Sequence, residues 1–208
     1  MLQLPRRSLI SAAGLAWLSS ALPAFAAPAV GQAAPDFTLK DTAGRAVRLA
    51  EFKGKHVVLE WVNPGCPYVR KHYNSANMQG TQKDAAAKGV VWLSVNSTAP
   101  EHSDYQAPAA MAQWMQQHKA AASATLMDGD GKLGRAYGAR TTPHLYIVDG
   151  SGTLVYAGGI DNKPSANPAD VATATNHVKV ALAEMQAGKP VSQATTRPYG
   201  CSVKYSSM

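Results

Sequence analysis

The sequence is poor in cysteine and in charged residues. Only 2 of its 208 residues are cysteine, and 16% are charged. Two cysteines are too few for a four-cysteine zinc site or for a small scaffold held by several disulfides. A hydrophobic content of 46%, without internal repeats, excludes disordered, coiled-coil and repeat architectures. The length then predicts one domain with a sizeable core.

The sequence also lacks a stripe of basic residues. The formal net charge is +7, but the lysines and arginines are scattered, and the densest basic group is Arg70, Lys71 and His72. Proteins that bind nucleic acid carry Lys and Arg clustered on one face. We therefore expect no nucleic-acid partner.

The first 26 residues have the pattern of an export signal. Arg6 and Arg7 precede an apolar stretch over residues 9–22, and an Ala-x-Ala cleavage site ends at Ala26. This order predicts a signal peptide over 1–26 that is cleaved after Ala26, and an exported, periplasmic protein. The arginine pair resembles a twin-arginine signal, with Sec export as the alternative. The apolar stretch is short for a span of ~20 residues, so we expect no stable membrane insertion.

The mature chain is predicted to hold a linker over residues 27–34, one domain over 35–190 and a tail over 191–208. Within the domain, two buried strands over 57–62 and 90–95 are joined by a predicted helix over 67–88. Such a unit implies a parallel, right-handed crossover. The other predicted elements are an N-terminal hairpin over 35–49, helices over 108–119, 132–137 and 168–187, a short strand over 125–127, and a second hairpin over 144–157. The fold class is therefore α/β with a mixed sheet.

Cys66 lies where the first buried strand gives way to a helix that begins with Pro67. A thiol at a helix start faces unpaired N–H groups and the positive end of the helix dipole. Both favour the thiolate, which is the nucleophilic form of cysteine. The group Arg70, Lys71 and His72 adds positive potential. We therefore predict that Cys66 is a reactive cysteine.

Several short motifs occur in an order that resembles the thioredoxin superfamily, and more narrowly its peroxiredoxin-like redoxins of the AhpC/TSA type. The motifs are Pro35-Asp36-Phe37, Asn63-Pro64-Gly65-Cys66-Pro67-Tyr68, Thr141-Thr142-Pro143 and Gly200-Cys201-Ser202-Val203-Lys204-Tyr205. The resemblance covers residues 30–205. It implies a thioredoxin-like fold, with a central mixed sheet flanked by helices, an N-terminal hairpin and a C-terminal tail.

The resemblance also implies roles for four residues. Cys66 takes the place of the nucleophilic cysteine, and Thr142 and Pro143 take the places before and at a cis-proline. Thioredoxins carry a second cysteine three residues after the first, where this sequence has Val69. Peroxidase members carry Thr or Ser three residues before the cysteine, where this sequence has Asn63. The first departure means that Cys66 cannot form the usual Cys-x-x-Cys disulfide. The second makes disulfide exchange the expected chemistry rather than peroxide reduction.

Cys201 is the only other cysteine and hence the only possible partner of Cys66 within the chain. We expect an exported thiol–disulfide oxidoreductase or antioxidant redoxin in which Cys201 resolves the oxidised Cys66. The tail is expected to dock when the pair is oxidised and to leave when it is reduced. The expected partners are protein or small-molecule disulfides or peroxides and an outside thiol reductant.

Two alternatives remain open from the residues. The pair can be a purely structural disulfide in a binding protein without enzymatic activity. The other alternative is a copper carrier in which cysteine together with His72 or His144 binds the metal. The leading reading requires no metal and no cofactor.

Overall fold

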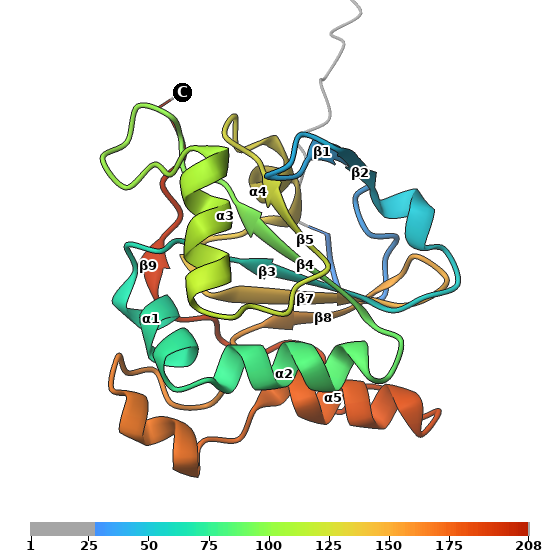
Figure 1. Ribbon diagram of the computed structural model, residues 1–208. Coiled ribbons are helices and arrows are strands. Elements are labelled where there is room, and N and C mark those ends of the chain that lie inside the picture. The colour runs from blue at the N-terminus through green and yellow to red at the C-terminus, as the bar shows by residue number, and fades with distance from the viewer. Residues whose placement is uncertain (1–27, 208) are drawn as a thin grey trace, which may run out of the picture.

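The computed structural model describes residues 28–207, and the predicted signal peptide over 1–26 lies outside these residues. Five strands form the central sheet in the order β5-β4-β3-β7-β8 (Figure 1). They are β3 (Val57–Trp61), β4 (Val91–Asn96), β5 (Ala124–Met127), β7 (His144–Val148) and β8 (Leu154–Gly158). Strands β3, β4 and β5 run parallel, whereas β7 and β8 add antiparallel neighbours. The predicted mixed sheet is confirmed.

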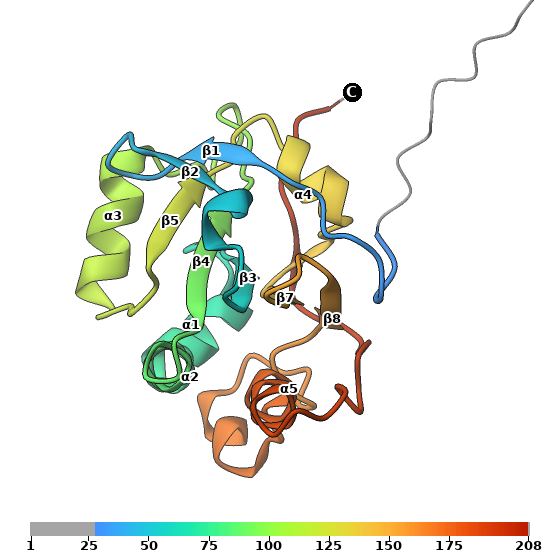
Figure 2. The ribbon, with the colours of Figure 1, turned by 90° about the vertical axis from the view of Figure 1, so that its right-hand side faces the viewer.

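Elements cover both faces of the sheet (Figure 2). One face packs against α1 (Pro67–Asn74), α2 (Asn77–Ala86), α3 (Pro108–Gln117) and α5 (His177–Gln186). The other face packs against β1 (Thr38–Lys40), β2 (Ala46–Arg48), a 3₁₀ turn over Leu49–Phe52 and α4 (Lys132–Tyr137). All five residues of β3 are buried, as expected for a central strand with both faces covered. The carboxyl end of β3 leads to Cys66.

Two predicted helices are each divided in the structure. The helix predicted over 67–88 is broken into α1 and α2, and the residue at the break is Ala76, with φ 57° in the left-handed region. Gly80, where the helix pattern is weakest, lies inside α2. The helix predicted over 168–187 begins as a 3₁₀ turn, Pro168–Thr173, and α5 starts separately after Asn176. Asn176 accepts a hydrogen bond from the Lys179 N–H and so provides a second helix start within one apolar pattern.

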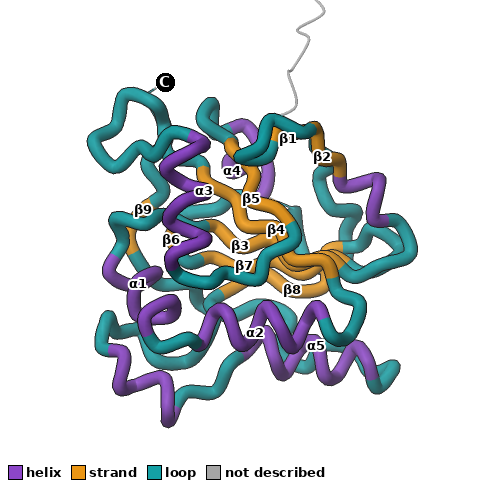
Figure 3. Tube along the Cα trace, viewed as in Figure 1, coloured by secondary structure: helices purple, strands orange, loops and turns teal. Residues whose placement is uncertain are grey.

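The C-terminal tail folds back onto the domain. A two-residue strand, β9 (Cys201–Ser202), pairs antiparallel with β6 (Thr141–Thr142), with Thr142 opposite Cys201 (Figure 3). The peptide bond between Thr142 and Pro143 is cis, as predicted. Both cysteines are free thiols. The tail is docked here while both cysteines are thiols, and its release on reduction stays a prediction.

Within residues 28–207, no helix is long and apolar enough to cross a membrane.

Candidate thiol site

Cys66 is the N-cap residue of α1 and follows the loop after β3. Its backbone is extended, with φ −79° and ψ 122°, and Pro67 begins the helix after it. The residue is only 2% exposed, and its Sγ donates a hydrogen bond of 3.0 Å to the carbonyl oxygen of Thr142. The predicted position at a helix start is confirmed. The structure also shows that the thiol is covered, which the sequence pattern does not indicate.

Thr142 brings the two cysteines together. Its carbonyl oxygen accepts the hydrogen bond from Cys66, and its backbone pairs with Cys201 across β6 and β9. Burial, followed by a hydrogen bond and charge repulsion from Cys66, raises the pKa of Cys201 to about 12. The Thr142 hydroxyl is buried and has no hydrogen-bond partner among the described residues. Four of the residues singled out in the sequence, Cys66, Thr142, Pro143 and Cys201, thus form one cluster.

Asn63 shapes the loop before Cys66 and does not contact the thiol by hydrogen bonding. Its side-chain N–H donates to Thr98 Oγ1 at 3.1 Å, and its carbonyl oxygen accepts from the Gly65 N–H at 2.7 Å. The Cys66 N–H donates to the Asn63 backbone oxygen at 3.1 Å. The amide oxygen and one of its two N–H groups are therefore engaged with Gly65 and Thr98, and Asn63 orients the loop.

The three residues of the basic group after Cys66 are placed differently in the structure. Arg70 is exposed and donates to the Pro64 carbonyl at 2.8 Å. Lys71 and His72 are buried, with 1% and 0% exposure. The ammonium group of Lys71 and the ring nitrogens of His72 therefore point into the protein interior, where these side chains contact residues from two other segments.

Lys71 and His72 belong to a buried cluster with Asp161 and Tyr199. Lys71 Nζ lies 3.6 Å from Asp161 Oδ2 and donates to the Lys163 carbonyl at 2.7 Å. The Tyr199 hydroxyl donates to Asp161 Oδ1 and lies 3.1 Å from His72 Nε2. Burial lowers the pKa of His72 to about 4, so the ring is neutral near pH 7. Tyr199 is two residues before Cys201, and this cluster therefore ties the tail to α1.

His144, which follows Pro143, also does not hydrogen-bond to a thiol. The Arg140 N–H donates to its Nδ1 at 3.4 Å, and the Tyr146 hydroxyl lies 3.2 Å from the same nitrogen. Burial and then the charge of Arg140 lower the pKa of His144 to about 3. Among residues 28–207, no three His, Cys, Asp or Glu side chains are grouped so that they could hold a metal ion.

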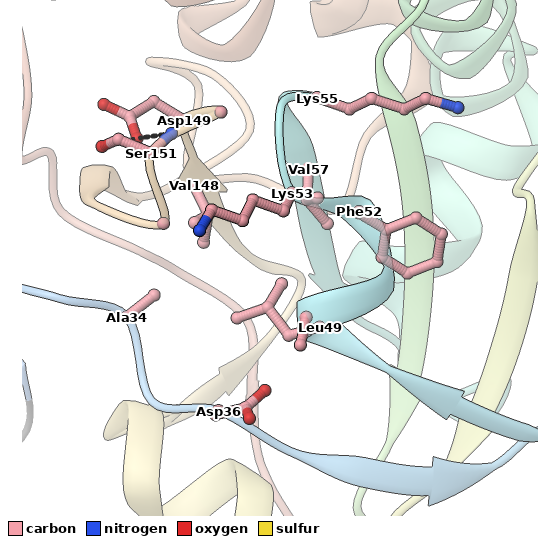
Figure 4. A pocket seen from close by; sticks show the side chains of 13 residues that line it. Ala34, Asp36, Leu49, Phe52, Lys53, Lys55, Val57, Val148, Asp149 and Ser151 are labelled. Carbon is pink, nitrogen blue, oxygen red and sulfur yellow. Dashed lines mark hydrogen bonds between the residues drawn. The ribbon is translucent and has the colours of Figure 1, made fainter.

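Cavities lie at both ends of β3. A cavity of about 520 Å³ flanks the thiols and is lined by Tyr68, Thr141, Asp161 and Gly200, among others. At the opposite end, a cavity of about 260 Å³ lies where β3 starts at Val57 and β7 ends (Figure 4). The side chains of Lys53 and Asp149 are drawn there, but no cysteine lines it. The chemistry-bearing residues therefore gather at the carboxyl end of β3.

The chain matches the AhpC/TSA family over residues 30–157. It belongs to this family. It is 28% identical over 135 residues to the thiol-disulfide oxidoreductase ResA of Geobacillus thermodenitrificans, which covers 62% of this chain and 68% of that protein. It is 34% identical over 65 residues to the peroxiredoxin Bcp of Bacillus subtilis, and this match spans only 29% of the chain and 41% of Bcp.

Solved structures agree with this assignment. An uncharacterized conserved protein from Geobacillus kaustophilus has a TM-score of 0.73 and 25% identity, over 86% of this chain and 94% of that one. The thioredoxin domain of a thiol-disulfide oxidoreductase from Bacteroides vulgatus has a TM-score of 0.50 and 26% identity, over 63% and 89% of the two chains. The protein is thus a thioredoxin-superfamily redoxin, in a family of thiol–disulfide oxidoreductases, as the motifs predict.

This redoxin contains a second buried carboxyl that the sequence reasoning missed. Glu60 in β3 is 0% exposed and accepts hydrogen bonds from four side chains: Trp92 at 2.7 Å, Tyr73 at 2.9 Å, Gln82 at 3.0 Å and Ser94 at 3.1 Å. Burial raises its pKa, and these hydrogen bonds act against that shift. The signal was a charged residue inside an otherwise apolar run, Val57-Val58-Leu59-Glu60-Trp61-Val62.

Asp161 and Tyr199 were missed for a different reason. Their partners on α1 are about 90 and 130 residues away in the chain, at separations that no local pattern reports. The sequence carries a Tyr before a Gly-Cys pair and an Asp after a hairpin, both of which are ordinary loop residues.

Proposed function

We propose that this redoxin is an exported thiol–disulfide oxidoreductase in which Cys66 is the attacking thiol and Cys201 is the resolving thiol. The observation that carries the proposal is the pairing of β9 with β6. It puts Cys201 opposite Thr142, whose carbonyl oxygen holds the Cys66 thiol. The relationship to ResA supports the reaction class, since that protein is named a thiol-disulfide oxidoreductase.

The reaction proceeds in two exchanges. The Cys66 thiolate attacks one sulfur of a substrate disulfide, which forms a mixed disulfide and releases the other half of the substrate as a thiolate. The Cys201 thiolate then attacks the Cys66 sulfur and releases the second half. The substrate disulfide is reduced by two electrons, and the Cys66–Cys201 pair is oxidised to one disulfide. An outside thiol reductant restores both thiols.

The docked tail fits the second exchange. Cys201 is already beside Cys66, but its pKa of about 12 keeps it as the unreactive thiol. Part of that rise comes from Cys66, through a hydrogen bond and through charge. Conversion of Cys66 to a mixed disulfide removes the contributions that come from Cys66, so the pKa of Cys201 falls and the second exchange becomes easier. Burial, the largest cause of the rise, remains.

Disulfide exchange is favoured over peroxide reduction at this site. Asn63 stands where peroxidase members carry Thr or Ser, and its amide is engaged by the Gly65 N–H and by Thr98 rather than by the Cys66 thiol. The match to Bcp, which is named a peroxiredoxin, spans 41% of that protein. We therefore expect reaction with protein or small-molecule disulfides to be faster than reaction with peroxides.

The test compares residues 27–208 as wild type, Cys66→Ser and Cys201→Ser with insulin, glutathione disulfide and hydrogen peroxide. Cys66→Ser should abolish disulfide reduction, whereas Cys201→Ser should accumulate a mixed disulfide at Cys66 that intact mass detects. Ser202→Ala, beside Cys201, is the control and should retain activity. A Cys66–Cys201 bridge with a reduction potential below about −300 mV would instead indicate a structural disulfide.

Export is tested separately. The predicted signal over residues 1–26 supports it, because a basic start, a short apolar centre and an Ala-x-Ala site occur in that order. Protein recovered from the periplasm should have the intact mass of a chain that begins at Ala27. A chain that keeps residues 1–26 would overturn the proposal of a cleaved signal.

A further inference from the structure

The tail is docked although no disulfide holds it. Both cysteines are free, and β9 contributes only two residue pairs with β6. Two-stranded pairing is marginal in water without further packing. Contacts outside β9 must therefore stabilise the docked tail, and Tyr199 makes those that reach buried charged groups.

Tyr199 is bound from two directions within the buried cluster. Its hydroxyl donates to Asp161 Oδ1, and Lys71 Nζ lies 3.4 Å from the hydroxyl oxygen and 5.4 Å from the ring centroid. The ring also packs edge-on against Tyr68, at 5.9 Å between centroids. Tyr68 and Lys71 both belong to α1, the helix that Cys66 begins. Tyr199 thus links the tail directly to the helix of the nucleophilic cysteine.

The buried charges of Lys71 and Asp161 are compensated by each other and not by solvent. The side chains of Lys71 and Asp161 are 0% and 1% exposed, so neither ion is compensated by water. One Asp161 oxygen, Oδ2, has no hydrogen-bond partner among the described residues. The buried carboxylate therefore depends on the nearby Lys71 cation at Oδ2 and on the donors to Oδ1, one of which the tail supplies.

The connection from Tyr199 to Cys201 is short and stiff. Gly200, the single residue between them, has φ 137°, and a Cβ at this position would collide with the Thr142 carbonyl oxygen. The backbone of the tail therefore passes directly against the carbonyl that holds the Cys66 thiol. With Tyr199 anchored on one side and β6 on the other, Cys201 has little freedom to leave Cys66.

We propose that Tyr199, held by Asp161 and Lys71, is the positioning residue that keeps Cys201 beside Cys66 while both cysteines are still thiols. The tail would then be fixed before the reaction starts, and the second exchange would not wait for it to arrive. This inference deepens the proposed function and rests on it for its role in catalysis. The docking itself can be tested without any activity.

The experiment measures how fast Cys201 is alkylated by iodoacetamide in the reduced protein, residue by residue, with mass spectrometry. The docked Cys201 is a protonated thiol, since its pKa is raised to about 12, so alkylation reports release of the tail. Tyr199→Phe keeps the ring but removes the hydrogen bond to Asp161. We expect at least a tenfold faster alkylation of Cys201, because hydrogen bonds to charged groups are the strong ones and tenfold corresponds to about 1.4 kcal/mol.

Tyr205→Phe is the matched control. Tyr205 lies on the same tail, and its hydroxyl donates to a neutral partner, the Ala139 carbonyl, at 2.7 Å. Its loss should speed alkylation of Cys201 less than about threefold. The accelerated rate in Tyr199→Phe should also depend weakly on urea, because release of a tail exposes much less surface than global unfolding.

Equal effects of the two substitutions, or an acceleration that rises steeply with urea, would overturn the positioning role and indicate general destabilisation. The result is separable from the proposed function. If Cys201 becomes accessible in Tyr199→Phe but the wild-type pair does not form a disulfide with glutathione disulfide, the anchor is real and the redox proposal fails. If the pair forms readily but Tyr199→Phe changes nothing, only the anchor fails.

Discussion

Glu60 and Asp161, two of the buried carboxyl groups of this protein, are surrounded very differently. Glu60 accepts four side-chain hydrogen bonds, from strand and helix residues of the domain, and no Lys or Arg is among its donors. Asp161 lies beside a buried lysine and takes its strongest side-chain donor from the tail. Glu60 therefore holds the core of one domain together, whereas Asp161 joins two segments that are far apart in the chain.

The difference explains why only one of the two carboxyls matters for the position of a cysteine. A fully hydrogen-bonded group in the core fixes the packing around it and has no remaining capacity for another segment. Asp161 has no hydrogen bond at Oδ2, which lies 3.6 Å from Lys71 Nζ, and it accepts a hydrogen bond from Tyr199 at Oδ1. Changes near Glu60 should lower global stability, and changes near Asp161 should also release the tail.

The largest effect is expected for Glu60→Ala. The substitution leaves four buried donors without their acceptor, and we expect the free energy of unfolding to fall by about 3–5 kcal/mol. Urea unfolding of the mature protein measures it. Glu101→Ala, at an exposed glutamate, is the control and should change stability by less than about 0.5 kcal/mol. A loss below about 1 kcal/mol for Glu60→Ala would show that these hydrogen bonds do not define the core.

The next effect is expected for Lys71→Met, which leaves the buried Asp161 without its cation. We expect a loss of about 3 kcal/mol of stability, and part of it should return in the double variant with Asp161→Asn, where no buried charge remains. Lys179→Met is the control, because Lys179 and Asp84 form an exposed pair at 2.8 Å that should contribute less than about 1 kcal/mol. If the double variant is as unstable as the sum of both single ones, the two residues do not act as a pair.

The pH dependence of the free energy of unfolding tests the buried cluster around Asp161 through His72. The pKa of His72 is about 4 in the folded protein, below the reference of about 6.5 that an unfolded chain approximates. Between pH 4 and 6.5 the unfolded chain binds more protons at this histidine than the folded protein does. The contribution of His72 to the free energy of unfolding is therefore fully present above about pH 6.5. It is lost as the pH falls toward 4, by up to about 1.4 kcal/mol for each pH unit.

His72→Gln should flatten this slope when the free energy of unfolding is measured from pH 7 to 4 in both proteins. Glu60 has a raised pKa and contributes a slope of the opposite sign, but it is present in both proteins and cancels in the difference. Identical slopes for the two proteins would mean that His72 is not buried as a neutral ring.

The sequence predicts well those parts of the site that are built by local patterns. A buried strand followed by a proline-started helix predicted Cys66 at the start of α1. The place of Thr142 and Pro143 beside Cys66 was implied by the family resemblance, because no local pattern reports a contact between residues 76 positions apart.

The break in the helix after Cys66 and the anchoring of the tail could not be predicted in this way. The break falls at Ala76, a good helix former, because α2 turns to pack against β4 and α5. Anchoring depends on Lys71, Asp161 and Tyr199, which meet only after the whole domain has folded. The burial of Lys71 could not be predicted for the same reason, since the carboxylate that it pairs with lies in another segment.

The smallest effect is expected for Tyr73→Phe, the counterpart of Tyr199→Phe at the other carboxyl. Tyr73 donates to Glu60 at 2.9 Å, as Tyr199 donates to Asp161, and both substitutions remove one hydroxyl from a buried carboxyl. Glu60 keeps three other donors, so the loss of stability should be about 1 kcal/mol, measured by urea unfolding. Alkylation of Cys201 should stay within about twofold of wild type, because none of the hydrogen bonds to Glu60 comes from the tail. If Tyr73→Phe releases the tail as strongly as Tyr199→Phe does, the two carboxyl clusters are coupled through α1 and the contrast between them is wrong.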